Sequence, residues 1–202
     1  MELDHYSIDA ALSSLTVRAF ASAAFAALGN SPTLILREFA GWARFAPGTF
    51  DGACVHIKVN AASLTVVETM SDEDRRAIEY AITREVLEIE SYPEIIFCSS
   101  RVSVSKAGDG RYWINLVGDL SLHGVTGTQP VAAQVALTGN TLRAHGEFTL
   151  LHTSYKMKPV PVPGGKLKLK LKEEVKCSFD ILARKQPDLV RQEDHLVPAE
   201  GL

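Results

Sequence analysis

The sequence predicts a mainly β fold, an antiparallel barrel interrupted by one helix, on the basis of two observations. Apolar and polar residues alternate along many short segments, which is typical of strands that have one face in a core and the other in water. Turn-forming pairs such as Pro47-Gly48, Asp51-Gly52 and Gly139-Asn140 separate these segments. Tandem hairpins of this kind build an up-and-down sheet, and closing that sheet into a barrel removes its unpaired edges.

The alternating segments define the expected strands. Residues 54–59 give the clearest one, because Val55, Ile57 and Val59 occupy one face while their polar neighbours occupy the other. In segment 33–45 we expect Gly41 to introduce a bend or bulge that turns the strand around the barrel. The remaining strands are expected over 15–19, 94–100, 102–104, 112–122, 131–137, 142–149, 166–172 and 175–182.

One segment has a helical period instead. Three acidic residues at 72–74 favour the positive N-terminus of a helix, and apolar residues between Ile78 and Ile89 recur near the three-to-four spacing. Pro93 prevents the helix from continuing much further. We therefore expect one α-helix over about 72–90, packed near one end of the barrel.

The length and composition fit one ordinary globular domain. The chain has 202 residues, of which 46% are hydrophobic and 22% are charged. We expect a barrel domain over residues 1–185 and a polar C-terminal tail over 186–202. No apolar run reaches the roughly 18 residues of a membrane-spanning helix, and we identify no signal peptide. Because Cys54, Cys98 and Cys177 have neither metal-site nor disulfide-framework spacing, a cytoplasmic protein with reduced thiols is expected.

The net charge of −3 conceals an uneven distribution. Segment 152–185 contains nine Lys and Arg residues against three acids, so the rest of the chain is strongly acidic. The alternating Lys and Leu residues at 166–172 predict an edge strand whose lysines face water. The same face could make peripheral contact with an anionic membrane surface or an acidic partner. Nucleic acid is not an expected partner, because no aromatic residues interleave these lysines and the sequence pI is about 6.1.

The sequence contains no recognisable catalytic or metal-binding motif. His123, His145 and His152 lack the spacing of a zinc motif, and an interval of seven would place His145 and His152 on opposite faces of one strand. There is no GxSxG elbow and no glycine-rich phosphate loop. We expect no metal, no cofactor and no enzymatic activity. An enzyme acting on isoprenoid or quinone substrates through His123 or His145 is the catalytic alternative.

Several blocks of sequence carry a family resemblance. The specific ones are YPEIIF at 92–97 and GDLSLHGVT at 118–126, supported by YSID at 6–9 and REFAG at 37–41. In this order they make residues 3–185 similar to the YceI-like family of polyisoprenoid-binding, lipocalin-like lipid-binding proteins. Two departures are that Lys156 stands where members commonly have glycine, and that only Ser13-Ser14 represents the His-Ser often found near the start.

The resemblance implies an extended eight-stranded antiparallel barrel with a helix near one end and a tunnel for a long-chain apolar molecule. That ligand would be a polyisoprenoid, a quinone-like lipid or a fatty acid derivative, bound for transport or storage without catalysis. The tunnel lining is then the aliphatic face of each matching strand: Leu15, Val17, Val55, Ile57, Val59, Ile95, Phe97, Leu120, Leu122, Phe148, Leu150, Val175 and Phe179.

Two further questions stay open at the level of sequence. An apolar barrel interior is either filled by its own side chains or holds an apolar ligand, and periodicity does not decide between the two. The chain could instead be a protein-interaction or structural module that uses the lysine-rich strand at 166–172 or the tail. A homodimer is compatible with either role.

Overall fold

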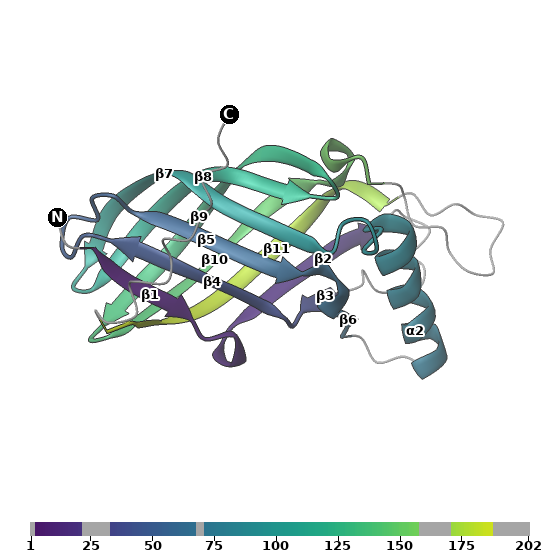
Figure 1. The fold of residues 1–202 in the computed structure, drawn as a ribbon, viewed down its shortest axis with the longest axis horizontal. Helices are drawn as coiled ribbons and strands as arrows, with labels where there is room; N and C mark the ends of the chain where they lie inside the picture. The colour runs from purple at the N-terminus through teal and green to yellow at the C-terminus, as the bar shows by residue number, and fades with distance from the viewer. Residues whose placement is uncertain (1–2, 22–32, 68–70, 158–170, 188–202) are drawn as a thin grey trace, which may run out of the picture.

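The computed structural model describes residues 3–21, 33–67, 71–157 and 171–187. In these residues eleven strands form one antiparallel sheet, rolled into an elongated barrel (Figure 1). The strands are β1 (Asp4–Ile8), β2 (Ser14–Ala21), β3 (Thr33–Leu36), β4 (Phe39–Phe45), β5 (Cys54–Asn60), β6 (Leu64–Val66), β7 (Glu94–Gly108), β8 (Arg111–Leu122), β9 (Val125–Thr138), β10 (Thr141–Leu151) and β11 (Leu171–Lys185).

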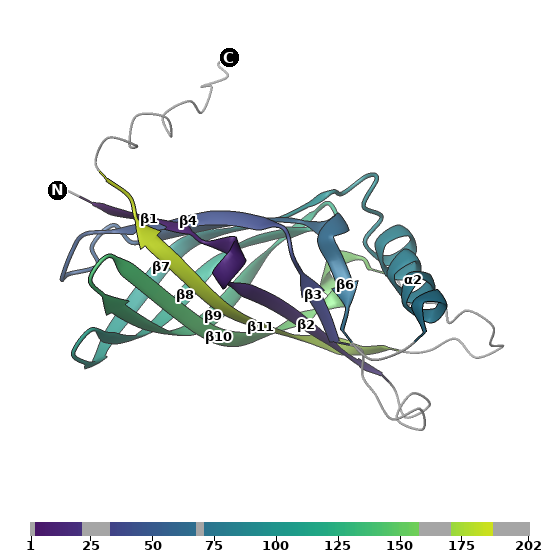
Figure 2. The same cartoon turned by 90° about the horizontal axis from the view of Figure 1, so that it is seen from below.

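Eight of these strands close a ring, as the sequence predicts. The order β1-β4-β5-β7-β8-β9-β10-β11 returns to its start because β11 also pairs with β1. The three short strands β2, β3 and β6 continue β1, β4 and β5 beyond a local break. They extend the barrel wall from β11 toward helix α2 (Asp72–Tyr80), which lies across that end of the barrel (Figure 2).

Each of the three breaks lies at a short segment outside the strands. The 3-10 turn η1 (Ala10–Leu12) separates β1 from β2, and the 3-10 turn η2 (Ala61–Ser63) separates β5 from β6. Residues 37–38 separate β3 from β4, and the Arg37 amide there donates to the Ser63 carbonyl at 3.4 Å. The strand is interrupted at residues 37–38 and not at Gly41, so the predicted position of the bend is wrong.

Gly41 lies inside β4 and serves close packing. A Cβ at this position would lie 2.4 Å from the His56 carbonyl oxygen and 2.9 Å from Ile8 Cδ1. Only a residue without a side chain lets β4 approach β5 this closely. The sequence pattern also missed β1, whose five residues are too few and too polar to show a clear alternation.

The helix is shorter than the predicted 72–90. The α-helical hydrogen-bond pattern ends at Tyr80, and a π-helical turn, η3, continues over Ala81–Val86. The Leu87 amide donates to the Ile82 carbonyl at 2.9 Å, and Glu88 then adopts a φ of 48°, which a right-handed helix does not allow. The chain leaves the helix here and reaches β7 through Pro93.

Helix α2 covers the free edge of β6. Within the described residues β6 pairs only with β3, so its outer edge exposes backbone groups beside the helix. Glu79 of α2 accepts a hydrogen bond from the Val66 amide at 2.8 Å. One carboxylate thus takes the place of a neighbouring strand and protects an edge that would otherwise be free to pair.

The last turn before the undescribed segment 158–170 contains a strained residue. Lys156 ends the 3-10 turn η4 (His152–Tyr155) with φ 56° and ψ 17°, in the left-handed region. A residue with a Cβ pays roughly 1 kcal/mol for this conformation, and glycine does not. Glycine would therefore suit this position better than lysine.

We predict that Lys156→Gly raises the free energy of unfolding by up to about 1 kcal/mol, because glycine adopts the left-handed conformation without strain. Urea denaturation monitored by circular dichroism measures the change. Lys156→Ala is the matched control, since it removes the same side chain but keeps the Cβ, and it should bring no gain. Equal stabilisation by both variants would contradict the explanation.

Candidate functional site

The strand register places the thirteen predicted lining residues on one face of the sheet, the inner face. Directly paired residues in an antiparallel sheet share a face, and so do residues two apart on one strand. The same register continues from β8 to β11. Ile114 of β8 pairs with Ala133 of β9, Ala133 pairs with Gly146 of β10, and Gly146 pairs with Phe179 of β11. Register pairs within the predicted set are Val59 with Ile95, Ile57 with Phe97, Phe97 with Leu120, Leu150 with Val175, and Phe179 with Leu15.

The inner face differs in burial along the barrel. Five of the thirteen residues are buried: Val59, Leu120, Leu122, Leu150 and Val175. The other eight keep part of their surface accessible although they face the interior: Leu15, Val17, Val55, Ile57, Ile95, Phe97, Phe148 and Phe179.

Four inner-face side chains from four strands have the loosest surroundings. Val55, Val102, Leu116 and Phe148 are only partly buried, and in the described part of the chain none of them packs against either buried cluster. Side chains in filled cores touch many neighbours and lose nearly all of their accessible surface. The middle of this barrel does not have that packing.

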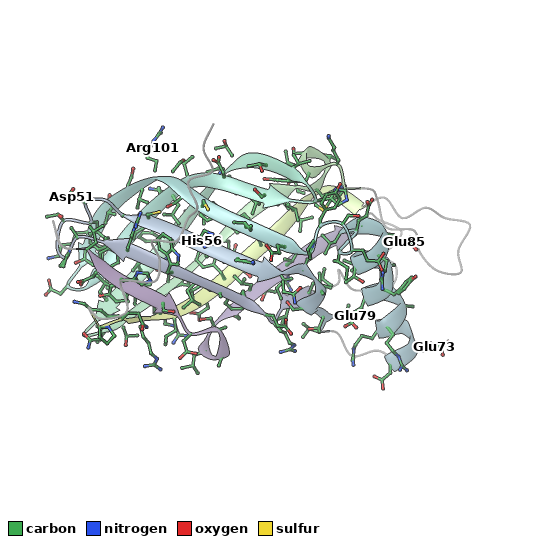
Figure 3. All side chains as sticks on the ribbon, in the orientation of Figure 1. Asp51, His56, Glu73, Glu79, Glu85 and Arg101 are labelled. Carbon is green, nitrogen blue, oxygen red and sulfur yellow. The ribbon has the colours of Figure 1, made fainter. Side chains whose placement is uncertain are left out.

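An aromatic cluster closes the end of the barrel away from α2. Tyr6 and Phe45 stack with ring centroids 5.2 Å apart, Phe45 and Phe50 stack at 4.8 Å, and Phe50 meets the edge of Tyr112 at 4.6 Å. Sequence analysis missed this cluster, although Phe45 and Phe50 flank the Pro47-Gly48 turn that places them together. Figure 3 shows Asp51 at this end and Glu73, Glu79 and Glu85 at the other.

The second buried cluster closes the α2 end. Ile82, Val86 and Leu87 of the helical segment pack with apolar residues of the wall strands, and with Tyr155 and Met157 at η4. This cluster depends on side-chain contacts between separate elements, because the sheet is not continuous from β6 to β7 in the described residues. The two ends of the barrel are therefore closed in different ways.

His123 has a structural position in this end cluster. It forms the two-residue β8–β9 turn with Gly124, and both have a positive φ, as a type I′ hairpin turn requires. Its Nδ1 lies 3.0 Å from the Tyr155 carbonyl oxygen and its Nε2 lies 3.5 Å from Glu88 Oε1. The ring thus connects the hairpin to η4 and lies beside Glu88, although Nε2 makes no hydrogen bond.

His145 lies far from His123. It sits on β10, exposed on the outer face, with Nε2 3.1 Å from Gln134 Oε1. Along β9, Gln134 is nine residues from the His123 turn, which is roughly 30 Å of strand. The structure therefore does not bring these two histidines into one catalytic site.

The three cysteines divide between the faces of the wall. Cys177 faces inward between Val17 and Phe148, and burial raises the pKa of its thiol to about 12. Cys98 is exposed on the outer face, and its pKa is also raised, mainly by desolvation and then by Cys54 and Asp119. Neither thiol has the lowered pKa of a catalytic nucleophile.

Two polar side chains are buried toward the α2 end, and sequence analysis assigned neither to the interior. Gln129 retains 7% of its accessible surface and His152 retains 6%. Gln129 is satisfied, because its amide donates to the carbonyls of Pro130 and Thr149 at 2.9 and 3.3 Å. His152 Nε2 is buried without a hydrogen-bond partner, which costs about 1–3 kcal/mol. The interval of seven residues predicted that His145 and His152 lie on opposite faces, and His145 is indeed exposed outside whereas His152 is buried.

The predictions for the lysine-rich strand and for the C-terminal tail concern residues that lie mostly outside the described ranges. Residues 166–170 of the lysine-rich strand and 188–202 of the tail lie outside the described residues, and only the backbone of Leu171 and Lys172 enters β11. Among the described residues no group of three His, Cys, Asp or Glu side chains could hold a metal ion. No helix within those same ranges combines the length and apolarity that crossing a bilayer requires.

Solved structures share this architecture. Burkholderia cenocepacia BcnA is 19% identical, with a TM-score of 0.65 over 87% of this chain and 98% of its own. A polyisoprenoid binding domain from Saccharophagus degradans, implicated in plant cell wall breakdown, is 13% identical, with a TM-score of 0.64 over 90% and 98%. The Campylobacter jejuni YCEI protein is 10% identical, with a TM-score of 0.56 over 76% and 85%.

A search of curated protein sequences finds no match to this chain. The family comparison is decisive, because the YceI-like domain matches residues 6–183 and so spans the barrel from β1 to β11. The blocks at 92–97 and 118–126 that first indicated this resemblance lie at the start of β7 and around the β8–β9 hairpin that His123 connects to η4. The chain belongs to the YceI-like domain family.

Proposed function

We propose that this protein binds a long-chain apolar lipid of the polyisoprenoid type inside the barrel and carries or stores it without catalysis. The observation that supports the proposal most is the loose packing of Val55, Val102, Leu116 and Phe148 between two tightly packed ends. Apolar side chains that face one another without filling the space between them favour an apolar occupant.

The dimensions of the wall suit an extended chain. β9 has 14 residues, so it rises roughly 46 Å, and with the usual barrel tilt it spans about 35 Å along the axis. Each methylene buried in such a space contributes about 0.8 kcal/mol. A many-carbon ligand would therefore bind with little need for polar contacts. The description of the Saccharophagus degradans relative as polyisoprenoid binding supports the same class of ligand.

Identification of the bound molecule tests the proposal directly. We expect native mass spectrometry of the purified protein to show a non-covalent adduct, and organic extraction to release a long-chain apolar molecule. Delipidated protein should bind an added prenol. Protein that is lipid-free as purified, and that takes up no prenol after delipidation, would contradict the proposal.

A small-to-large substitution distinguishes a hollow interior from a filled one. We predict that Cys177→Phe abolishes lipid retention while changing the melting temperature by less than about 3 °C, because the ring occupies space that the lipid would use. In a filled core the same change should cost about 1–3 kcal/mol through overpacking. Lys176→Phe is the matched control, since this adjacent side chain faces outward and should leave lipid retention intact.

Thiol chemistry reports on the interior independently. With a pKa of about 12, only roughly one Cys177 thiol in 10⁴ is ionised at pH 8. Alkylation by iodoacetamide should therefore be very slow at Cys177 and rise about tenfold per pH unit between pH 8 and 10. Peptide mapping by mass spectrometry separates this residue from exposed Cys98, which should react first. Equal rates at pH 8 would show that Cys177 is not desolvated.

A further inference from the structure

The α2 end of the barrel contains two buried polar residues, Gln129 and His152. β9 and β10 pair from Thr138 with Thr141 as far as Ala132 with Glu147, and no further. Beyond that point β9 contains Pro130, which has no amide hydrogen to offer a neighbouring strand. The two strands separate here, and the Gln129 side chain spans the separation by donating to the Thr149 carbonyl.

The turn η4 folds over this separation and brings His152 with it. η4 contacts both β9 and β11, and the Tyr155 hydroxyl lies against Gly127, 3.2 Å from where a Cβ would stand. The His123 ring holds the Tyr155 carbonyl at 3.0 Å, and the Met157 amide donates to the His152 carbonyl at 3.3 Å. These contacts hold η4, and with it His152, against the wall strands and the β8–β9 hairpin.

The His152 side chain is left with an unused hydrogen-bonding atom. The residue is 94% buried and its Nε2 has no partner, whereas the amide nitrogen of Gln129, the other buried polar residue at this end, donates to two carbonyls. Imidazole Nε2 can donate or accept a hydrogen bond, depending on the tautomer. A buried group of this kind matches a ligand that brings one hydroxyl or carbonyl oxygen.

We propose that His152 hydrogen-bonds the polar end of the bound lipid, so that the protein selects a chain with a neutral oxygen-bearing head over a pure hydrocarbon. This inference rests on the proposed function. It places the head of the lipid at the α2 end and the tail toward the aromatic cluster of Tyr6, Phe45 and Phe50. The buried carboxylate at that other end, Asp4, is already paired with Lys185 at 2.9 Å.

The head group that fits is uncharged. The buried polar residues of the described chain are Asp4, Gln129 and His152. Arg75 of α2 has a buried Nε, but its side chain is partly exposed and its guanidinium pairs with Asp72 at 3.3 Å. A phosphate or diphosphate drawn into this position would lack a buried cation to compensate its charge, and burying an unpaired charge is strongly unfavourable. The class that remains is a long-chain alcohol, a quinone or an amide.

A matched pair of ligands tests the inference. Delipidated protein is titrated in native mass spectrometry with geranylgeraniol and with the hydrocarbon that has the same carbon skeleton but no hydroxyl. We expect wild-type protein to bind the alcohol more tightly than the hydrocarbon. His152→Phe should weaken the alcohol about tenfold and leave the hydrocarbon unchanged or tighter, because it keeps a ring but removes the hydrogen bond.

Two further variants make the result specific. His152→Gln retains a hydrogen-bonding group and should restore part of the preference for the alcohol, while His145→Phe on the outer face should change neither ligand. The melting temperature of lipid-free His152→Phe should be unchanged or raised, since an unsatisfied polar atom is removed.

The outcomes are distinguishable. Equal effects of His152→Phe on both ligands, or no effect on either, would overturn the role of His152 and assign it to packing or to a bound water. Wild-type protein that binds neither ligand would instead overturn the proposed lipid-binding function itself.

Discussion

The closure of the barrel depends on β11. Its 15 residues pair along one side with β10 over eleven register positions, and along the other side first with β2 and then with β1. No other strand of the described chain joins both halves of the broken wall in this way. Because β1 and β2 are separated by a 3-10 turn, they stay in line only through their shared partner. The continuity of β11 therefore fixes where every inner-face residue points.

Breaking three wall strands has a structural consequence at the α2 end. An unbroken eight-stranded wall would close on itself and leave no edge, whereas here β6 leaves the ring and needs a substitute neighbour. Helix α2 provides it through Glu79 and through the apolar contacts of Ile82 and Leu87. A wall held by side-chain packing separates at lower cost than one held by a hydrogen-bonded ladder.

The sequence alone predicted the features that follow from the two-residue period of a strand, namely the strands themselves and the face on which each residue lies. Alternation identified most of the long strands, and the thirteen residues that the resemblance implies as tunnel lining all lie on the inner face, because register fixes a whole strand once one residue is oriented. It missed features set by distant contacts. The break at 37–38 involves Ser63, the aromatic cluster depends on strands that meet only in the closed barrel, and the hydrogen bonds of Gln129 depend on where β10 stops pairing with β9.

The position of the polar residues follows from the same break in pairing. In the middle of the barrel every wall strand has two neighbours, so backbone groups are satisfied and inward side chains can all be apolar. Where β9 and β10 separate, carbonyl oxygens lose their ladder partners, and a glutamine amide in the interior compensates two of them. Because the Gln129 amide is required there, this part of the barrel interior is no longer purely apolar. The His152 imidazole, two residues beyond Leu150, then lies in a part of the interior that already contains polar groups, which a purely apolar barrel would not offer.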